Sequence, residues 1–305
     1  MKLLALGALA AAALALPGGG VSGGAPGVTP TEILIGGTVP LSGSASAFGT
    51  VGPGANAYFK YVNAHGGVYG RKIKYIWRDD GYDPSRTLEQ TRELVQQDKV
   101  FAIFNTVGTE HNVAIRAYLN AVKVPQVFGG TGASIIARGY KKYPWTMGYL
   151  PSFVGEGAIY GRYVVKHRPK ARIAVLYENS DYGRDLLKGL ERGLGTKRSR
   201  IVAKATYEVT DSDVNSQIAR LRRSKADTFM LFALPLQAIQ SFVYADKLKW
   251  RPQSFVSAVS IEPRVMGIAR AATNGRATNN ALSVAFVKDP TSRSSSAREI
   301  GRAHV

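Results

Sequence analysis

The stretch VPLSGSASAFGTVGPGANAYFKYVNAHGGVYG, residues 39–70, decides the fold of this chain, and RKIKYIWRDDGYDP, residues 71–84, continues it. A short apolar strand is expected just before it, over Ile33–Gly37, and a loop of small residues leads from that strand into a helix. Gly66 and Gly67 end the helix, because glycine readily takes the positive φ of a helix C-terminus. A second strand is expected over Lys72–Arg78. The pattern predicts a β-loop-α-β unit whose loop lets backbone N–H groups face a small ligand beside a helix N-terminus.

Strands and helices alternate along the rest of the chain, with one pause near Met147. Such alternation implies parallel sheets with helices on both faces. We therefore expect an α/β protein of two lobes, each a mainly parallel sheet flanked by helices, with a hinge near the pause. After the first unit, the expected strands are 100–105, 125–129, 172–177, 201–207, 228–233 and 254–258, and the expected helices are 84–97, 110–121, 155–167, 183–193, 214–223 and 236–248.

The ordered series of short motifs at the start of the first lobe resembles the type I periplasmic solute-binding proteins, in the Leu/Ile/Val-binding branch that serves ABC importers of branched-chain amino acids. No single motif is specific, but their order is. Asp181-Tyr182-Gly183 and the segment 211–221 extend the resemblance into the second lobe. The matching residues of the first lobe are Pro40-Leu41-Ser42-Gly43, Gly49, Gly54-Ala55, Asn63, Gly66-Gly67-Val68, Gly70-Arg71-Lys72-Ile73 and Asp79-Asp80 through Pro84.

The resemblance implies a type I periplasmic-binding-protein fold, with lobe 1 over residues 31–148 and lobe 2 over 149–281. It also implies a return of the chain towards lobe 1 over 282–290, with a strand at 282–287. Residues 291–305, TSRSSSAREIGRAHV, have no strand or helix periodicity and do not resemble the family. We expect this tail to be disordered and the C-terminal part of the fold to be truncated.

The first residues have the features of an export signal. Lys2 precedes the apolar run Leu3–Leu16, and Pro17 followed by glycines ends it. A basic start, a short apolar core and small residues describe a secretory signal peptide, expected over residues 1–25, and the run is too short to span a bilayer comfortably. The chain has no cysteine. We therefore expect a periplasmic protein without a lipid anchor on an N-terminal cysteine and without disulfides.

The chain is strongly basic, with a formal net charge of +19 over 305 residues. Clustered Lys and Arg are typical of phosphate binding, so nucleic acid has to be considered as a partner. The clusters at 141–142, 197–200 and 220–223 are scattered over expected helix ends and turns. They favour a solvated basic surface, and we expect no nucleic-acid partner. The resemblance implies instead a monomer that binds a small molecule and docks on the membrane permease of an ABC transporter.

Ligand chemistry is expected where strands of the first lobe end, because open α/β sheets bind ligands outside the carboxyl ends of their strands. Three loops qualify, 42–49, 105–109 and 130–134, and the last two lead into helix N-termini that can hold a carboxylate. Helix capping by Thr109 and Ser134 alone is the simpler alternative. In the resembled family these loops hold an amino acid's carboxylate, and aromatic residues close the site. The candidate ligand-binding residues are Ser42, Phe48, Val107, Gly108, Thr109, Gly130, Thr131, Gly132, Tyr182, Leu234, Val259 and Ser260.

The second lobe departs from the family pattern of amino-acid binders, which place a carboxylate there to receive the ligand's ammonium group. The corresponding region, Ser257–Ser260, has no acid before Glu262. Glu262 is expected to be a surface residue, with the missing acid in a slightly displaced position as the alternative. An ammonium group buried without an anion is costly. An aromatic or aliphatic acid without an amino group is therefore an alternative to an amino acid as the ligand.

Enzyme chemistry finds little support in the sequence. There is no G-x-S-x-G nucleophile motif, no Walker phosphate loop and no metal-ligand spacing among the four histidines. Asp79-Asp80 is a carboxylate pair, but beside Gly81 and Pro84 it is typical of a turn. We expect no cofactor and no catalysis. A ligand sensor on the same fold, responsive to an amide or an amino acid, is the alternative function, and a hydrolase is a more distant one.

Overall fold

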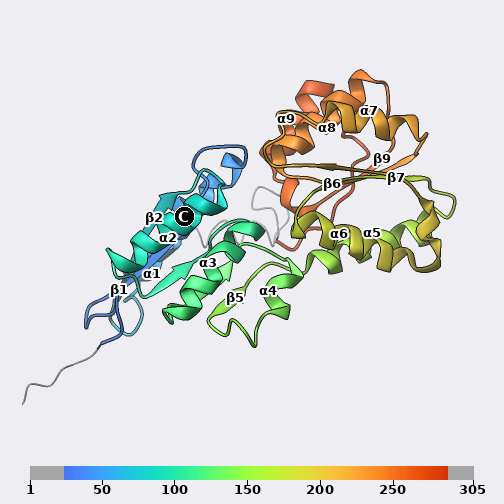
Figure 1. Cartoon of the computed structure of the whole chain (residues 1–305). Coiled ribbons are helices and arrows are strands. Elements are labelled where there is room, and N and C mark those ends of the chain that lie inside the picture. The colour runs from blue at the N-terminus through green and yellow to red at the C-terminus, as the bar shows by residue number, and fades with distance from the viewer. Residues whose placement is uncertain (1–23, 288–305) are drawn as a thin grey trace, which may run out of the picture.

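The computed structural model describes residues 24–287, and these form two α/β lobes, each with an all-parallel sheet flanked by helices, as predicted (Figure 1). The first sheet has the strand order β2-β1-β3-β4-β5 and the second the order β7-β6-β8-β9. The strands of the first lobe are β1 Glu32–Val39, β2 Lys72–Asp79, β3 Ala102–Phe104, β4 Gln126–Gly129 and β5 Thr146–Gly148. Those of the second lobe are β6 Ile173–Glu178, β7 Ile201–Tyr207, β8 Thr228–Phe232 and β9 Gln253–Val256.

The helices of the first lobe cover both faces of its sheet. Helices α2 (Pro84–Gln96) and α3 (Thr109–Ala121) bury Leu94 and Ile115 against one face, together with Ile103 of β3. On the other face lies α1 (Val51–Ala64), whose Phe59 packs edge-on against aromatic rings of the sheet. A five-residue helix, α4 (Ser134–Arg138), lies next to β5.

The second lobe has the larger core. Its sheet lies between α5 (Phe153–His167) and α6 (Asp181–Leu194) on one face and α7 (Asn215–Arg223), α8 (Pro235–Lys247) and α9 (Pro263–Thr273) on the other (Figure 1). Every residue of β8, TFMLF, is buried, as a central strand of a parallel sheet requires. Helices α5 and α6 approach closely because Gly157 faces the carbonyl oxygen of Leu186, where a Cβ would lie only 2.1 Å from that oxygen.

The predicted helices and strands are confirmed to within a few residues at most ends. Strand β3 is shorter than expected, because the chain turns at Asn105, which has a left-handed backbone with φ of 55°. The strand expected over residues 282–287 is not formed: in this segment only Leu282 pairs, in an isolated bridge to Phe255 of the second sheet. The predicted signal peptide, except for its last two residues, and the predicted tail over 291–305 lie outside the described residues, as do the last three residues of the segment 282–290.

Candidate functional site

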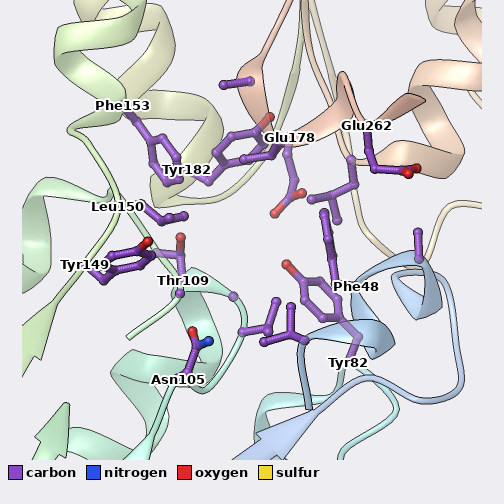
Figure 2. Close-up of a pocket in the computed structure, with 18 of the residues that line it drawn as sticks. Phe48, Tyr82, Asn105, Thr109, Tyr149, Leu150, Phe153, Glu178, Tyr182 and Glu262 are labelled. Atoms are coloured by element: carbon purple, nitrogen blue, oxygen red, sulfur yellow. The ribbon is translucent and has the colours of Figure 1, made fainter. Parts of the chain in front are cut away.

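A cavity of about 340 Å³ lies between the two lobes (Figure 2). Its walls come from the segments that follow β1, β2, β3, β4 and β5 in the first lobe and from the ends of β6 and β8 and the segment after β9 in the second. The carboxyl ends of both parallel sheets therefore face this cavity, which is where open α/β sheets place ligands. Its walls are mostly apolar, with few polar groups.

Eight of the twelve candidate ligand-binding residues line the cavity. Tyr182 is buried in its wall, where the ring packs edge-on against Phe153 with centroids 4.9 Å apart and the hydroxyl donates to the carbonyl of Ala233. Phe48, on a 3-10 turn (Ser46–Thr50), reaches across from the first lobe to the apolar cluster of the second. The eight residues are Phe48, Val107, Gly108, Thr109, Gly130, Tyr182, Leu234 and Val259.

The other four candidates lie outside the cavity wall and support it. The Ser42 hydroxyl donates to Asp79 at 2.6 Å, so Ser42 and Asp79 build the turn after β1. Gly132 lies against the carbonyl of Pro151, with no room for a Cβ. The Ser260 hydroxyl is buried and donates to the carbonyl of Ala233. These roles differ from the ligand contacts expected from the sequence.

Thr131, the fourth of these, lies one step behind the cavity. Its hydroxyl is 2.7 Å from the hydroxyl of Thr109, which does line the cavity, and it accepts a hydrogen bond from the backbone N–H of Ala133. A hydroxyl carries one proton. If Thr131 donates that proton to Thr109, the proton of Thr109 is free for a ligand. Thr131 therefore contacts Thr109 and does not line the cavity itself.

The N-terminus of α3 is the polar end of the cavity. Gly108, with φ of 104°, turns the chain into the helix, and the side chain of Asn112 holds this turn by donating to the carbonyls of Thr106 and Gly108, both at 2.7 Å. The first backbone N–H groups of a helix have no partner within the helix, and they attract negative charge. With the Thr109 hydroxyl and the side-chain amide of Asn105, this end of the cavity can hold a carboxylate.

The N-terminus of α4 does not face the cavity, contrary to the expectation that two helix N-termini converge on one ligand. Asp185, on α6 of the second lobe, occupies it: the carboxylate accepts from the backbone N–H of Ser134 at 2.6 Å and from the Ser134 hydroxyl at 2.9 Å. A second contact of the same kind joins the lobes, because Glu110 at the start of α3 accepts from the backbone N–H of Asp181 at the start of α6. Carboxylates thus occupy helix N-termini across the lobe boundary in both directions.

The region 257–260 has no acid before Glu262, as the sequence shows, but another part of the second lobe brings a carboxyl group to the cavity. Glu178, the last residue of β6, is 5% exposed and lines the cavity, with its side chain directed inwards (Figure 2). Burial raises the pKa of Glu178 from 4.5 to about 7, against the lowering effect of hydrogen bonds from Ser180 and Tyr207. A carboxyl group in this state exchanges between neutral and charged forms near neutral pH. Its position at the end of a predicted strand was the signal that could have revealed it.

Glu262 also lines the cavity, but at its edge. Its carboxylate accepts from the backbone N–H groups of Arg264 and Val265 at the start of α9, and in Figure 2 it points away from the cavity. Further lining residues that the sequence did not single out are Ala47, Thr50, Val51, Tyr82, Asn105, Tyr149, Leu150, Phe153, Ala258 and Phe286.

Two parallel α/β lobes that enclose a mostly apolar cavity at the ends of their strands define a two-lobed solute-binding protein. The chain belongs to the periplasmic binding protein family, whose model matches residues 32–298. The Leu/Ile/Val-binding protein homolog 7 of Brucella suis is 26% identical over 246 residues, covering 78% of this chain and 61% of that protein. The matches to the first three curated relatives span 46–61% of those proteins' lengths.

Solved structures share the fold. The branched-chain amino acid transporter substrate-binding protein LivJ of Streptococcus pneumoniae, in complex with isoleucine, superposes with a TM-score of 0.74 at 20% identity, over 90% of this chain and 76% of that one. An ABC-transporter solute-binding protein of Rhodopseudomonas palustris, in complex with 3,4-dihydroxybenzoic acid, gives a TM-score of 0.72 at 22% identity, over 90% and 73% of the two chains. At these identities the likeness establishes the type I periplasmic-binding-protein fold.

Two further properties bear on the site. Within residues 24–287, no group of three or more His, Asp or Glu side chains is arranged to hold a metal ion. Over the same residues, none of the helices has the length and apolar character needed to cross a membrane.

Proposed function

We propose that this protein is the substrate-binding component of an ABC importer of the branched-chain amino acid type, and that it closes its two lobes on a small solute bearing a carboxylate and an apolar body. The α3 N-terminus supports this proposal most directly. It is the polar end of a cavity whose other walls are largely apolar or aromatic side chains from both lobes. Contacts from both lobes favour the closed state, so the ligand contributes to closure.

The solute class includes amino acids and acids without an amino group. Glu178 offers one buried carboxyl group from the second lobe, which in its charged form can receive an ammonium group and in its neutral form can donate to a hydroxyl or carboxylate. The complexes of related folds with isoleucine and with 3,4-dihydroxybenzoic acid are consistent with both possibilities.

The family supports a location in the periplasm after export and a partner in the membrane permease of the transporter. We propose that the protein acts there as a monomer and without catalysis. N-terminal sequencing of the exported protein tests the location, since removal of residues 1 to roughly 25 is expected from the signal-like N-terminus.

Titration calorimetry with matched ligands tests the carboxylate requirement. The acid series consists of 4-methylpentanoate, hexanoate, benzoate and 3,4-dihydroxybenzoate, with leucine as the amino-acid member and with the neutral amide of each acid as its control. We expect at least one acid to bind and its amide to bind at least tenfold more weakly, because the amide lacks the negative charge that the α3 N-terminus attracts. Equal affinity for acids and amides, or no binding by any member, would contradict the proposal.

A further inference from the structure

A second cavity, of about 400 Å³, adjoins the first one. The two cavities share two wall residues, Tyr82 from the first lobe and Glu178 from the second. In Figure 2 the hydroxyl of Tyr82 and the carboxyl group of Glu178 point towards each other. These two side chains therefore form part of the wall between the two cavities.

The second cavity is acidic, unlike the protein as a whole. Four carboxyl groups line it, those of Asp83, Glu110, Glu178 and Glu208. Arg184 is the one cation that lines it within residues 24–287; this side chain is exposed and donates to the amide oxygen of Asn179. In a chain with a net charge of +19, this cavity is a local concentration of negative charge suited to a cationic group.

His111 is a buried polar side chain in the cavity wall that lacks a well-formed hydrogen bond. It is 3% exposed, and neither of its ring nitrogens has a partner of good geometry. Burial lowers the pKa of His111, so its ring is neutral and carries one acceptor nitrogen. Buried polar groups without partners are costly, and a ligand with N–H donors would satisfy them.

The wall between the cavities is held in an unusual conformation. Tyr82 has a left-handed backbone, with φ of 59°, and Asp80 fixes it by accepting from its backbone N–H at 3.0 Å. The Tyr82 ring lies against the His111 ring, with centroids 4.1 Å apart. A left-handed backbone is uncommon for a bulky residue and persists where the surroundings impose it, often at ligand sites.

We propose that the second cavity is a subsite for a cationic group, an ammonium or a guanidinium, at the far end of a solute whose carboxylate lies at the α3 N-terminus. This inference rests on the proposed function of the first cavity. Glu110 of the first lobe and Glu178 of the second line the cavity, and Glu208, which is exposed and accepts from Asn179, adds negative charge. The acceptor nitrogen of His111 completes the set.

Titration calorimetry with two matched series tests the subsite: straight-chain fatty acids of four to seven carbons, and the same acids with a terminal amino group. Both carry the carboxylate, and only the second carries the distal cation. At the best chain length, the acid with the terminal amino group (the ω-amino acid) should bind at least fivefold more tightly than the plain acid of the same length. Glu208→Gln, which keeps an acceptor for Asn179, should reduce that advantage in affinity at least threefold. It should leave the affinity for the plain acid unchanged. Glu89→Gln, an equal charge change on the outer face of α2, should change neither.

The outcomes separate the two proposals. If plain acids bind as well as their amino counterparts at every length, the subsite is wrong and the carboxylate site stands. If the ω-amino acids bind more tightly but Glu208→Gln leaves that advantage intact, the cation is held elsewhere and the subsite is again wrong. If no member of either series binds, the subsite is wrong, and the carboxylate site is decided by the series of acids and amides described above.

Discussion

The Asp185 carboxylate of the second lobe accepts two hydrogen bonds from Ser134 of the first, from the backbone N–H at 2.6 Å and from the hydroxyl at 2.9 Å. Asp185 is 7% exposed and does not line the cavity. The contact therefore joins the lobes without touching the site where a solute is expected. An interaction made only in the closed arrangement adds to the ligand's apparent affinity, and we propose that this contact is one.

Removal of the Asp185 carboxylate should weaken ligand binding without changing the cavity. Hydrogen bonds to a charged group are worth about 1.5–3 kcal/mol each, so Asp185→Ala should lower the affinity for the best member of the acid series by roughly tenfold or more. Ser134→Ala removes only the hydroxyl donor and should have a smaller effect. Calorimetry gives the affinities, and small-angle X-ray scattering of the ligand-bound protein should show a more open shape for Asp185→Ala. An affinity equal to that of the wild type would show that the contact does not control closure.

Substitutions of Thr109 and Thr131 should distinguish the residue that contacts the ligand from the residue behind it that supports the site. Their hydroxyls are bonded to each other, but only Thr109 lines the cavity. Thr109→Val and Thr131→Val each remove one hydroxyl from this pair, so both should cost about 1–2 kcal/mol of stability. Thr109→Val should also lower acid binding by roughly 5- to 30-fold, while Thr131→Val should cost less affinity. Thermal unfolding and calorimetry on the two variants provide the comparison, and a larger loss of affinity in Thr131→Val would contradict the assigned roles.

Glu178 should make the ligand-free protein less stable as the pH rises. Its pKa is raised in the folded state to about 7, so the folded protein binds a proton more tightly than the unfolded chain. Stability from this group is therefore present below pH 4.5 and is lost as the pH rises to about 7, by up to ~3 kcal/mol. Glu178→Gln removes this dependence, so its melting temperature should exceed that of the wild type more at pH 8 than at pH 5.

Glu262→Gln is the control for this comparison, because its carboxylate caps α9 and points away from the cavity. It should not reproduce the pH-dependent gain. A melting-temperature difference between Glu178→Gln and the wild type that stays constant from pH 5 to pH 8 would show that Glu178 titrates in its ordinary range.

Two glycines of α5 offer a matched test of the packing in the second lobe. A Cβ on Gly157 would lie 2.1 Å from the carbonyl oxygen of Leu186 on α6, whereas the nearest atom to a Cβ on Gly155 is 3.6 Å away. Gly157→Ala should destabilise the protein by about 1–3 kcal/mol, because the two helices must separate. Gly155→Ala should be neutral or stabilising by up to about 1 kcal/mol, since alanine is the better helix former. Equal melting temperatures for the two variants would mean that the helices are not in close contact.

The sequence was sufficient for the fold and for eight of the twenty residues that line the cavity, for physical reasons that can be named. Alternating apolar strands and amphipathic helices are local patterns, so strand β7 could be predicted with its ends. Phe48 and the residues around Thr109 followed from the rule that ligands lie at strand ends. Glu178 and the role of Thr131 could not be predicted in this way. They depend on which side chains two lobes bring together over long sequence separations.

The pair formed by Asp185 and Ser134 illustrates the same limit. Ser134 stands at a predicted helix start, where a ligand or a cap within its own loop is the ordinary expectation. Its actual partner is 51 residues away in the sequence and belongs to the other lobe. The positions of helix N-termini are local properties, but the group that occupies each of them is decided by tertiary structure.

The central claim is that a solute carboxylate lies at the N-terminus of α3, between the lobes. A crystal structure of the protein with the tightest-binding member of the acid series tests it most directly. We expect carboxylate oxygens within about 2.7–3.2 Å of the backbone N–H groups of the first turn of α3 and of the Thr109 hydroxyl. We also expect the apolar body of the solute to lie among Phe48, Tyr182 and Leu234. A solute bound with its carboxylate in solvent, or bound outside the space between the lobes, would contradict the account.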